Sequence, residues 1–121
     1  MKALILLAHG SRREASAIEI KKLAESLEKL AEGKFDIVRA AFIQFCGPSF
    51  NEVVEELKNH EVNKMVVLPY FISAGNHVVK DIPELIAEAK IKNPDITFKV
   101  TEHFGRFSAL KELIIKETVK L

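Results

Sequence analysis

Short apolar runs alternate with longer amphipathic segments along the whole chain. The run from Ala3 to Ala8 is continuously apolar, which is typical of a strand buried on both faces of a sheet. Similar runs predict three further strands, over residues 35–43, 65–71 and 96–101.

The segments between these runs carry helix signals. Ser-x-x-Glu patterns at Ser11 and Ser49 have the form of capping boxes and predict the starts of two helices. A third helix is expected to begin at Asp81, with Pro83 in its first turn, and a fourth to cover residues 108–121.

Four strand–helix units in a row predict an α/β fold with a parallel sheet and helices on both faces. Because crossovers between parallel strands are right-handed, few topologies remain. We expect a flavodoxin-like three-layer sandwich with strand order 2-1-3-4, formed by a single domain over residues 1–121.

Composition narrows the classes of function. The chain is 48% hydrophobic and 29% charged, with a formal net charge of +1, so bulk charge argues for neither nucleic acid nor an anionic membrane as a partner. The N-terminal apolar run is too short for a signal peptide, and no run approaches the length of a membrane span. The single cysteine, Cys46, excludes an internal disulfide and fits a cytoplasmic location.

Two histidines follow strands that the predicted order places side by side. His9 comes directly after the first strand, and His77 lies on the loop after the third. In an open parallel sheet, ligands bind at the carboxyl ends of the strands where the strand order reverses. We therefore expect both imidazoles at one crevice. Imidazole suits transition metals and proton transfer, and two histidines suit an open site that receives and releases a metal.

The other histidines are weaker candidates. His60 lies at a polar helix end and is expected to be solvated, while His103 follows the fourth strand at the same edge as His9. Taken by itself, His-Gly after a strand is equally compatible with a simple turn.

Several motifs resemble the sirohydrochlorin chelatases, above all the small, single-domain type that inserts cobalt or nickel into sirohydrochlorin. They are Ala8-His9-Gly10-Ser11-Arg12, Ala41-Phe42-Ile43-Gln44-Phe45 with Pro48-Ser49, Leu68-Pro69-Tyr70-Phe71 with Gly75-x-His77, and Asp81-Ile82-Pro83. The resemblance covers most of the chain, ending with Glu102-x-x-Gly105.

The resemblance implies a metal-inserting lyase of cobalamin or related tetrapyrrole biosynthesis. His9 would be a metal ligand and proton acceptor, and His77 the second metal ligand. Co²⁺ or Ni²⁺ would be a substrate, with no permanently bound cofactor, and the small members form homodimers. The residues that would contact the tetrapyrrole are Ser11, Arg12, Gln44, Ile72, Ser73, Ala74, Gly75, Asn76 and His77.

One position departs from the family pattern. Gln44 lies where the family usually has a glutamate, and a neutral amide can neither take up a proton nor offer a negative ligand. Glu102 could compensate, and Cys46 is either a soft metal ligand or a buried thiol. The substrate's carboxylates make Arg12, Arg13, Lys80 and Arg106 candidate partners.

Two alternatives to a chelatase stay open. A non-catalytic module that binds a tetrapyrrole or a metal would use the same pocket, and Gln44 favours it. A histidine-dependent phosphoryl-transfer enzyme is also compatible with Ala8-His9-Gly10, although such enzymes carry an arginine before the histidine.

Overall fold

The computed structural model describes residues 1–73 and 75–121, and it leaves the side chains of residues 77–79 undescribed. Its elements run, in chain order, β1 (Lys2–Ala8), α1 (Glu14–Leu30), β2 (Ile37–Phe42), α2 (Phe50–Asn59), β3 (Lys64–Pro69), α3 (Asn76–Lys92), β4 (Thr97–Val100), the short 3₁₀ helix η1 (Phe104–Arg106) and α4 (Ser108–Thr118). The sheet is parallel with order β2-β1-β3-β4, which confirms the predicted topology.

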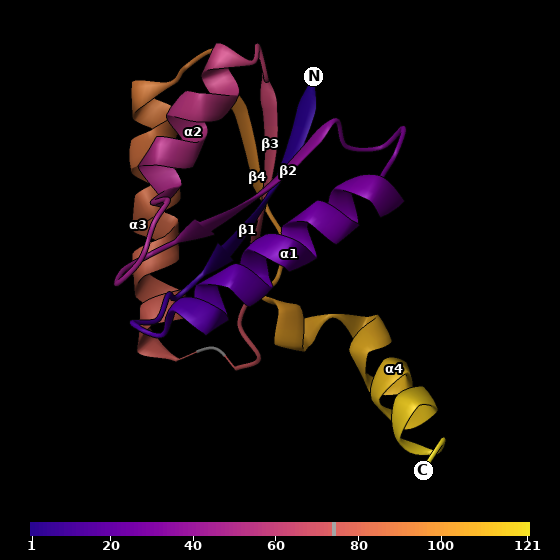
Figure 1. Cartoon of the computed structure of the whole chain (residues 1–121). Helices are drawn as coiled ribbons and strands as arrows, with labels where there is room; N and C mark the ends of the chain where they lie inside the picture. The colour runs from indigo at the N-terminus through magenta and orange to yellow at the C-terminus, as the bar shows by residue number, and fades with distance from the viewer. Residues whose placement is uncertain (74) are drawn as a thin grey trace.

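The strands separate two apolar cores. α1 crosses one face of the sheet, while α2 and α3 lie on the other (Figure 1). Leu6 and Ala8 of β1 face α1, whereas Ile5 and Leu7 face the other layer. All four side chains are buried, so the central strand is apolar on both faces, as its sequence predicts.

Helix α1 does not begin as predicted. Its N-cap is Arg13, whose side chain makes no capping hydrogen bond, and Glu14 is the first helical residue. The Ser11 hydroxyl instead accepts a hydrogen bond from the Arg13 backbone N–H at 3.0 Å. The predicted capping box at Ser11 is therefore wrong, because this serine stabilises the turn before the helix.

Helix α2 begins as predicted. Ser49 is its N-cap, the Ser49 hydroxyl accepts from the Glu52 N–H at 3.1 Å, and the Glu52 carboxylate accepts from the Ser49 N–H at 3.0 Å. These reciprocal bonds satisfy two backbone donors that the first turn leaves without helical partners. Hydrogen bonding from Ser49, mainly from its backbone N–H, lowers the pKa of Glu52.

Helix α3 begins earlier than predicted. It starts at Asn76 with Gly75 as its N-cap, so Asp81 and Pro83 lie inside the helix. His77, expected on a loop, is in the first helical turn. The helix buries Ile82, Ile86 and Ala89 against the sheet, and all three lie in the part of the helix that the sequence predicts from Asp81 onward.

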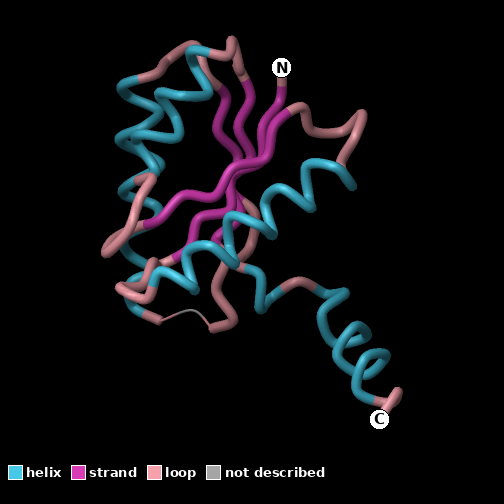
Figure 2. The backbone as a smooth tube through the Cα atoms, in the orientation of Figure 1, coloured by secondary structure: helices cyan, strands magenta, loops and turns pink. Residues whose placement is uncertain are grey.

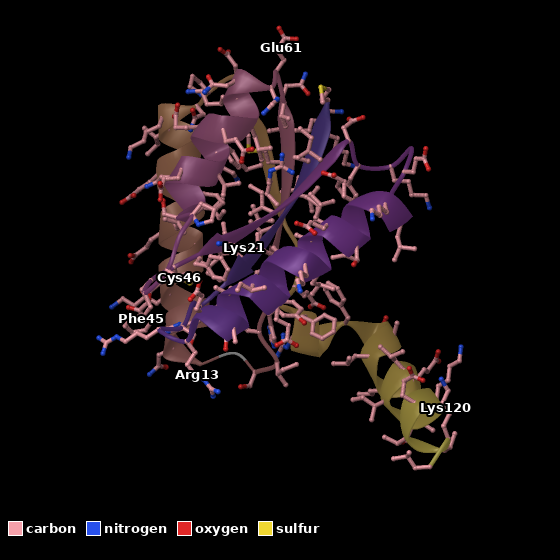
Figure 3. All side chains as sticks on the ribbon, in the orientation of Figure 1. Arg13, Lys21, Phe45, Cys46, Glu61 and Lys120 are labelled. Atoms are coloured by element: carbon pink, nitrogen blue, oxygen red, sulfur yellow. The ribbon has the colours of Figure 1, made fainter. Side chains whose placement is uncertain are left out.

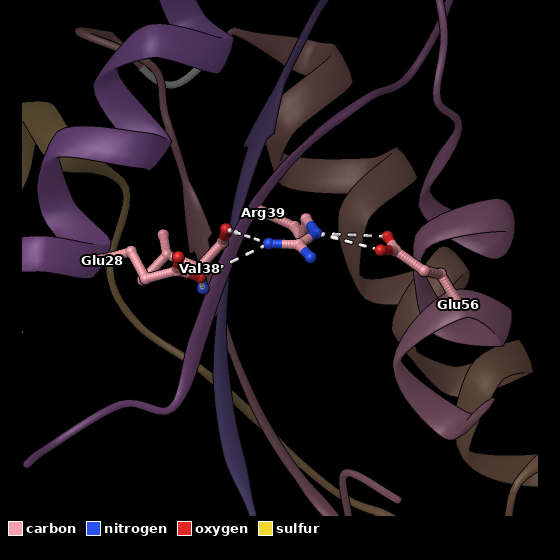
Figure 4. Close-up of polar contacts among 4 residues, drawn as sticks. All are labelled: Glu28, Val38, Arg39 and Glu56. Atoms are coloured by element: carbon pink, nitrogen blue, oxygen red, sulfur yellow. Dashed lines mark hydrogen bonds and ion pairs between the residues drawn. The ribbon is translucent and has the colours of Figure 1, made fainter. Parts of the chain in front are cut away.

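One arginine joins helices from opposite faces of the sheet. Arg39, on the edge strand β2, lies between Glu28 of α1 and Glu56 of α2 (Figure 4). Its Nε donates to both Glu56 carboxylate oxygens at 3.1 and 3.3 Å, and Nη1 donates to Glu28 at 3.4 Å. Glu28 also accepts from the backbone N–H of Val38 at 2.9 Å, which fixes the helix against the strand.

The C-terminal helix leaves the body of the molecule. α4 projects away from the three layers after η1 (Figures 1 and 2), and it contains no buried residue. Over the part of the chain that the structure describes, no helix is long and apolar enough to span a lipid bilayer.

Candidate functional site

Three strand ends meet at one edge of the sheet. The backbone N–H of Tyr70 donates to Leu7 at 2.9 Å, and that of Ile43 donates to Ala8 at 3.0 Å. The loops that follow β1, β2 and β3 therefore start side by side at the point where the strand order reverses. His9 is the first residue after β1, so it lies at the edge where the sequence places it.

His9 contacts Gln44 across this edge. The side-chain nitrogen of Gln44 lies 2.6 Å from Nε2 of His9, and the Gln44 backbone N–H donates to the His9 carbonyl at 3.0 Å. An amide nitrogen carries donors only, so this contact is a hydrogen bond when His9 is in the tautomer that leaves Nε2 unprotonated. The structure thus brings together two of the residues predicted from the sequence, His9 and Gln44, whose loops are 35 positions apart.

Aromatic rings surround the His9 imidazole. The ring of Phe71 stands edge-on at 6.5 Å, and the ring of Phe45 lies at 6.0 Å, measured between ring centroids. Phe45 is 51% exposed, lies at the outer side of its loop (Figure 3) and has a positive φ of 70°. Sequence reasoning gave Phe45 no role, because no sequence pattern signals a phenylalanine in this backbone conformation.

Arg12 extends the site on one side. Its guanidinium lies 4.9 Å from the centroid of the Phe45 ring, a cation–π arrangement. The row Arg12–Phe45–His9 therefore places a cationic group, an exposed aromatic face and an imidazole next to one another.

A hollow of about 340 Å³ opens beside these loops on the α1 face. Ala8, Gly10, Ser11 and Tyr70 line it together with the first turns of α1. The Tyr70 ring packs on Phe104 with centroids 5.3 Å apart. Phe42 also borders the hollow but is 2% exposed, so it belongs to the core, as its sequence context suggests. Volumes of this order hold small ligands or one edge of a larger one.

The predicted substrate segment after β3 is partly described. Ile72 is 71% exposed, and Ser73, Gly75 and Asn76 are also exposed. Ala74 and the side chain of His77 lie outside the described part of the structure. The predicted convergence of His9 and His77 therefore stays a prediction, although both backbones follow neighbouring strands.

The remaining candidates lie around the same edge. Cys46 is half-buried and packs against the core on the α1 face, and His103 is the N-cap of η1. Glu102 is exposed. Among the side chains that the structure describes, no group of three or more His, Cys, Asp or Glu is arranged to hold a metal.

The open parallel sheet makes this a flavodoxin-like α/β protein. Its small polar site, where His9 contacts the Gln44 amide, lies at the edge where the strand order reverses. The sequence model of the CbiX family matches residues 3–120, and the chain belongs to that family. This assignment confirms the resemblance that the motifs predicted.

Relatives with curated names agree with it. A sirohydrochlorin cobaltochelatase from Sulfurisphaera tokodaii is 30% identical over 120 residues, which cover 99% of this chain and 92% of that protein. One from Methanopyrus kandleri is 36% identical over 86 residues, 71% of this chain and 59% of the relative. The match with the Methanopyrus protein thus covers less than two thirds of that protein's length.

Solved structures match the fold. A CbiX protein from Marinobacter aquaeolei VT8 superposes with a TM-score of 0.82 at 29% identity, covering 99% of this chain and 95% of that one. The sirohydrochlorin chelatase SirB from Bacillus subtilis subspecies spizizenii, solved with cobalt, also gives 0.82. It covers 99% of this chain and 50% of its own length, and its 20% identity supports the fold alone.

Proposed function

We propose that this chain is a sirohydrochlorin chelatase that inserts Co²⁺ or Ni²⁺ into the macrocycle. The observation that carries the proposal is the position of His9 in a CbiX-family chain. His9 follows the central strand at the strand-reversal edge, and its imidazole lies beside Gln44 and Phe45. The family relatives named above act as sirohydrochlorin cobaltochelatases, which supports cobalt as the first metal to test.

Metal insertion requires the protein to supply a proton acceptor and a group that holds the metal beside the ring. Free sirohydrochlorin carries two pyrrolic N–H protons, and a metal enters only after those protons leave and the ring bends. A neutral imidazole can accept a proton, and it can also hold a metal beside the ring. His9 is our candidate for both tasks, and His77 is our candidate for the second metal ligand.

The macrocycle needs apolar contact and cationic partners for its carboxylates. The exposed ring of Phe45 offers apolar surface next to His9, and the exposed Ile72 directly follows Phe71, whose ring also neighbours His9. The Arg12 guanidinium lies over the Phe45 ring, so it is a cation beside that surface. Charge-assisted bonds from an arginine to a substrate carboxylate would orient the ring over the imidazole.

The test is a direct assay. The purified chain is mixed with sirohydrochlorin and Co²⁺ without oxygen, and the absorption spectrum is followed against the uncatalysed rate. We expect acceleration, with strong losses in His9→Ala and His77→Ala. His60→Ala is the matched control, because His60 caps the far end of α2, and it should retain the rate.

Two outcomes would contradict the proposal. No acceleration with Co²⁺, Ni²⁺ or Fe²⁺ would favour the alternative of a non-catalytic module that binds a tetrapyrrole or a metal. Acceleration that survives both histidine substitutions would refute the assigned roles of His9 and His77.

The partner that we propose is a second copy of the chain. Four large apolar side chains of the C-terminal segment, Leu113, Ile114, Ile115 and Val119, are between 49% and 73% exposed. Beside them an apolar hollow of about 390 Å³ is lined by Phe104, Phe107, Leu110 and Leu113, among others. Exposed apolar surface of this kind marks an interaction site. A single small domain can also contact a large macrocycle on only one of its faces.

The dimer is tested by light scattering on the eluting protein. We expect twice the chain mass, with Leu113→Glu shifting the protein to the monomer. Lys111→Gln, on the same helix but outside the lining of the hollow, controls for the same change of net charge. A monomeric parent protein, or a dimer that both substitutions leave intact, would refute this interface.

A cytoplasmic location stays a prediction from the sequence.

A further inference from the structure

The contact between Gln44 and His9 covers the ring nitrogen that a metal would need. The amide nitrogen lies 2.6 Å from Nε2, and an amide N–H can only donate. The tautomer of His9 that fits this contact is the one protonated on Nδ1, because only that tautomer presents an Nε2 lone pair to the amide N–H. A metal binds an imidazole through such a lone pair.

The backbones on both sides fix this contact. The Gln44 N–H donates to the His9 carbonyl at 3.0 Å, and the neighbouring Ile43 N–H donates to Ala8 at 3.0 Å. Gly10, next to His9, lies directly against the Gln44 carbonyl group. The two side chains thus start from backbones that are hydrogen-bonded to each other, and rotation of either side chain would break the contact.

We propose that Gln44 is a positioning residue that masks Nε2 of His9 in the metal-free protein. This inference rests on the proposed function. The amide holds His9 in the tautomer that a metal requires, yet competes with the metal for the same lone pair. Metal binding forms the metal–Nε2 bond and breaks the N–H···N bond, and no proton has to leave the ring.

Covering Nε2 of His9 affects how readily the metal passes from the protein to the macrocycle. Interactions that bind the substrate as strongly as the transition state do not accelerate the reaction. A metal held too tightly by His9 would stay on the protein rather than pass to the macrocycle. Gln44 weakens the ground-state hold on the metal, because each binding event must first break a hydrogen bond.

Gln44→Leu tests the mask, since leucine is similar in bulk but lacks donors. Long-range ¹H–¹⁵N NMR reports the tautomer of His9 in the metal-free protein. We expect the Nδ1-protonated form in the parent protein and a mixture of tautomers in Gln44→Leu. Co²⁺ titration, without tetrapyrrole, is followed by paramagnetic broadening of the His9 ring signals. We expect the variant to bind Co²⁺ about fivefold more tightly, the equivalent of one net hydrogen bond.

The controls separate this inference from the proposed function. Broadening of the His60 ring signals gives the background from nonspecific binding, and thermal unfolding verifies that the variant is folded. An unchanged tautomer, or Co²⁺ affinity that is equal or lower in Gln44→Leu, would overturn the mask. Neither measurement needs sirohydrochlorin. The tests on Gln44→Leu can therefore support the masking role in a protein that fails the insertion assay, and they can refute it in a protein that passes.

Discussion

The carbonyl oxygen of Gln44 occupies the space that any residue other than glycine at position 10 would need for its Cβ atom. A Cβ on Gly10 would lie 1.9 Å from that oxygen and 3.0 Å from the carbonyl carbon. Gly10 also has a φ of +102°, a conformation that favours glycine. The loops after β1 and β2 can therefore meet only with glycine here, and their meeting puts His9 beside Gln44.

Gly10→Ala should destabilise the protein and separate this pair. We expect the free energy of unfolding to fall by about 2 to 3 kcal/mol, because backbone strain and a steric clash add. Chemical denaturation measures the loss. Gly33→Ala is the matched control, since Gly33 has a φ of +85° but a Cβ added there would meet no neighbouring atom within 4 Å. It should lose only about 1 kcal/mol. Equal losses in the two variants would show that contact with Gln44 contributes nothing.

The topology was predictable because each strand is marked by a short, largely apolar run, which Arg39 interrupts in β2 and Lys99 in β4. The run from Ala3 to Ala8 identified the central strand, and right-handed crossovers then left few strand orders. The position of His9 followed from that order alone. Local start signals were less reliable. Ser49 caps its helix, whereas Ser11 stabilises a turn and Asp81 lies inside α3.

The details of the site depend on how the loops approach one another, which no local pattern encodes. The hydrogen bond between His9 and Gln44 requires the backbone of one loop to accept from the other. The exposed Phe45 also has a positive φ, a backbone conformation that its sequence context does not indicate.

Ser49→Ala should destabilise helix α2 in a pH-dependent way. Removing the N-cap hydroxyl should lower the free energy of unfolding by about 1 kcal/mol at neutral pH. Hydrogen bonding from Ser49, mainly from its backbone N–H and less from its hydroxyl, lowers the pKa of Glu52, so the charged carboxylate stabilises the folded state. Ser49→Ala removes only the part that comes from the hydroxyl. This contribution is present above the ordinary glutamate pKa and is lost as the pH falls through the lowered pKa of folded Glu52. The difference between the parent protein and the variant should therefore narrow in acid.

Glu52→Gln is the control for this titration. It keeps an acceptor opposite the Ser49 N–H but has no charge to lose in the acid range. In a Glu52→Gln background, the effect of Ser49→Ala should no longer change between neutral and acidic pH. If the loss of unfolding free energy caused by Ser49→Ala stays constant with pH in the parent background, the Ser49 hydroxyl does not contribute to the lowered pKa of Glu52.

Arg39→Met should loosen the edge of the sheet. The arginine bonds to carboxylates of two helices, but it is 35% exposed, and solvent screens such pairs. We expect a loss of about 1 kcal/mol in the free energy of unfolding, smaller at high salt. Lys58→Met removes a single exposed contact to Glu55 at 3.4 Å and should cost less than about 0.5 kcal/mol. If Arg39→Met and Lys58→Met lowered the free energy of unfolding by similar amounts, Arg39 would not be joining the two helices more strongly than an ordinary surface ion pair.

Arg12→Gln should weaken binding of the carboxylate-bearing macrocycle without slowing the insertion step. Arg12 lies over Phe45, whose ring neighbours His9, so its guanidinium can reach a carboxylate of a ring held at the imidazole. Loss of one charge-assisted hydrogen bond predicts a KM for sirohydrochlorin about tenfold higher, with kcat nearly unchanged. Lys22→Gln is the matched control, because Lys22 is exposed farther along α1 and the substitution removes the same charge. Its KM should change less than about twofold. Equal increases in KM for the two variants would mean that general electrostatic attraction, rather than the position of Arg12, accounts for the effect.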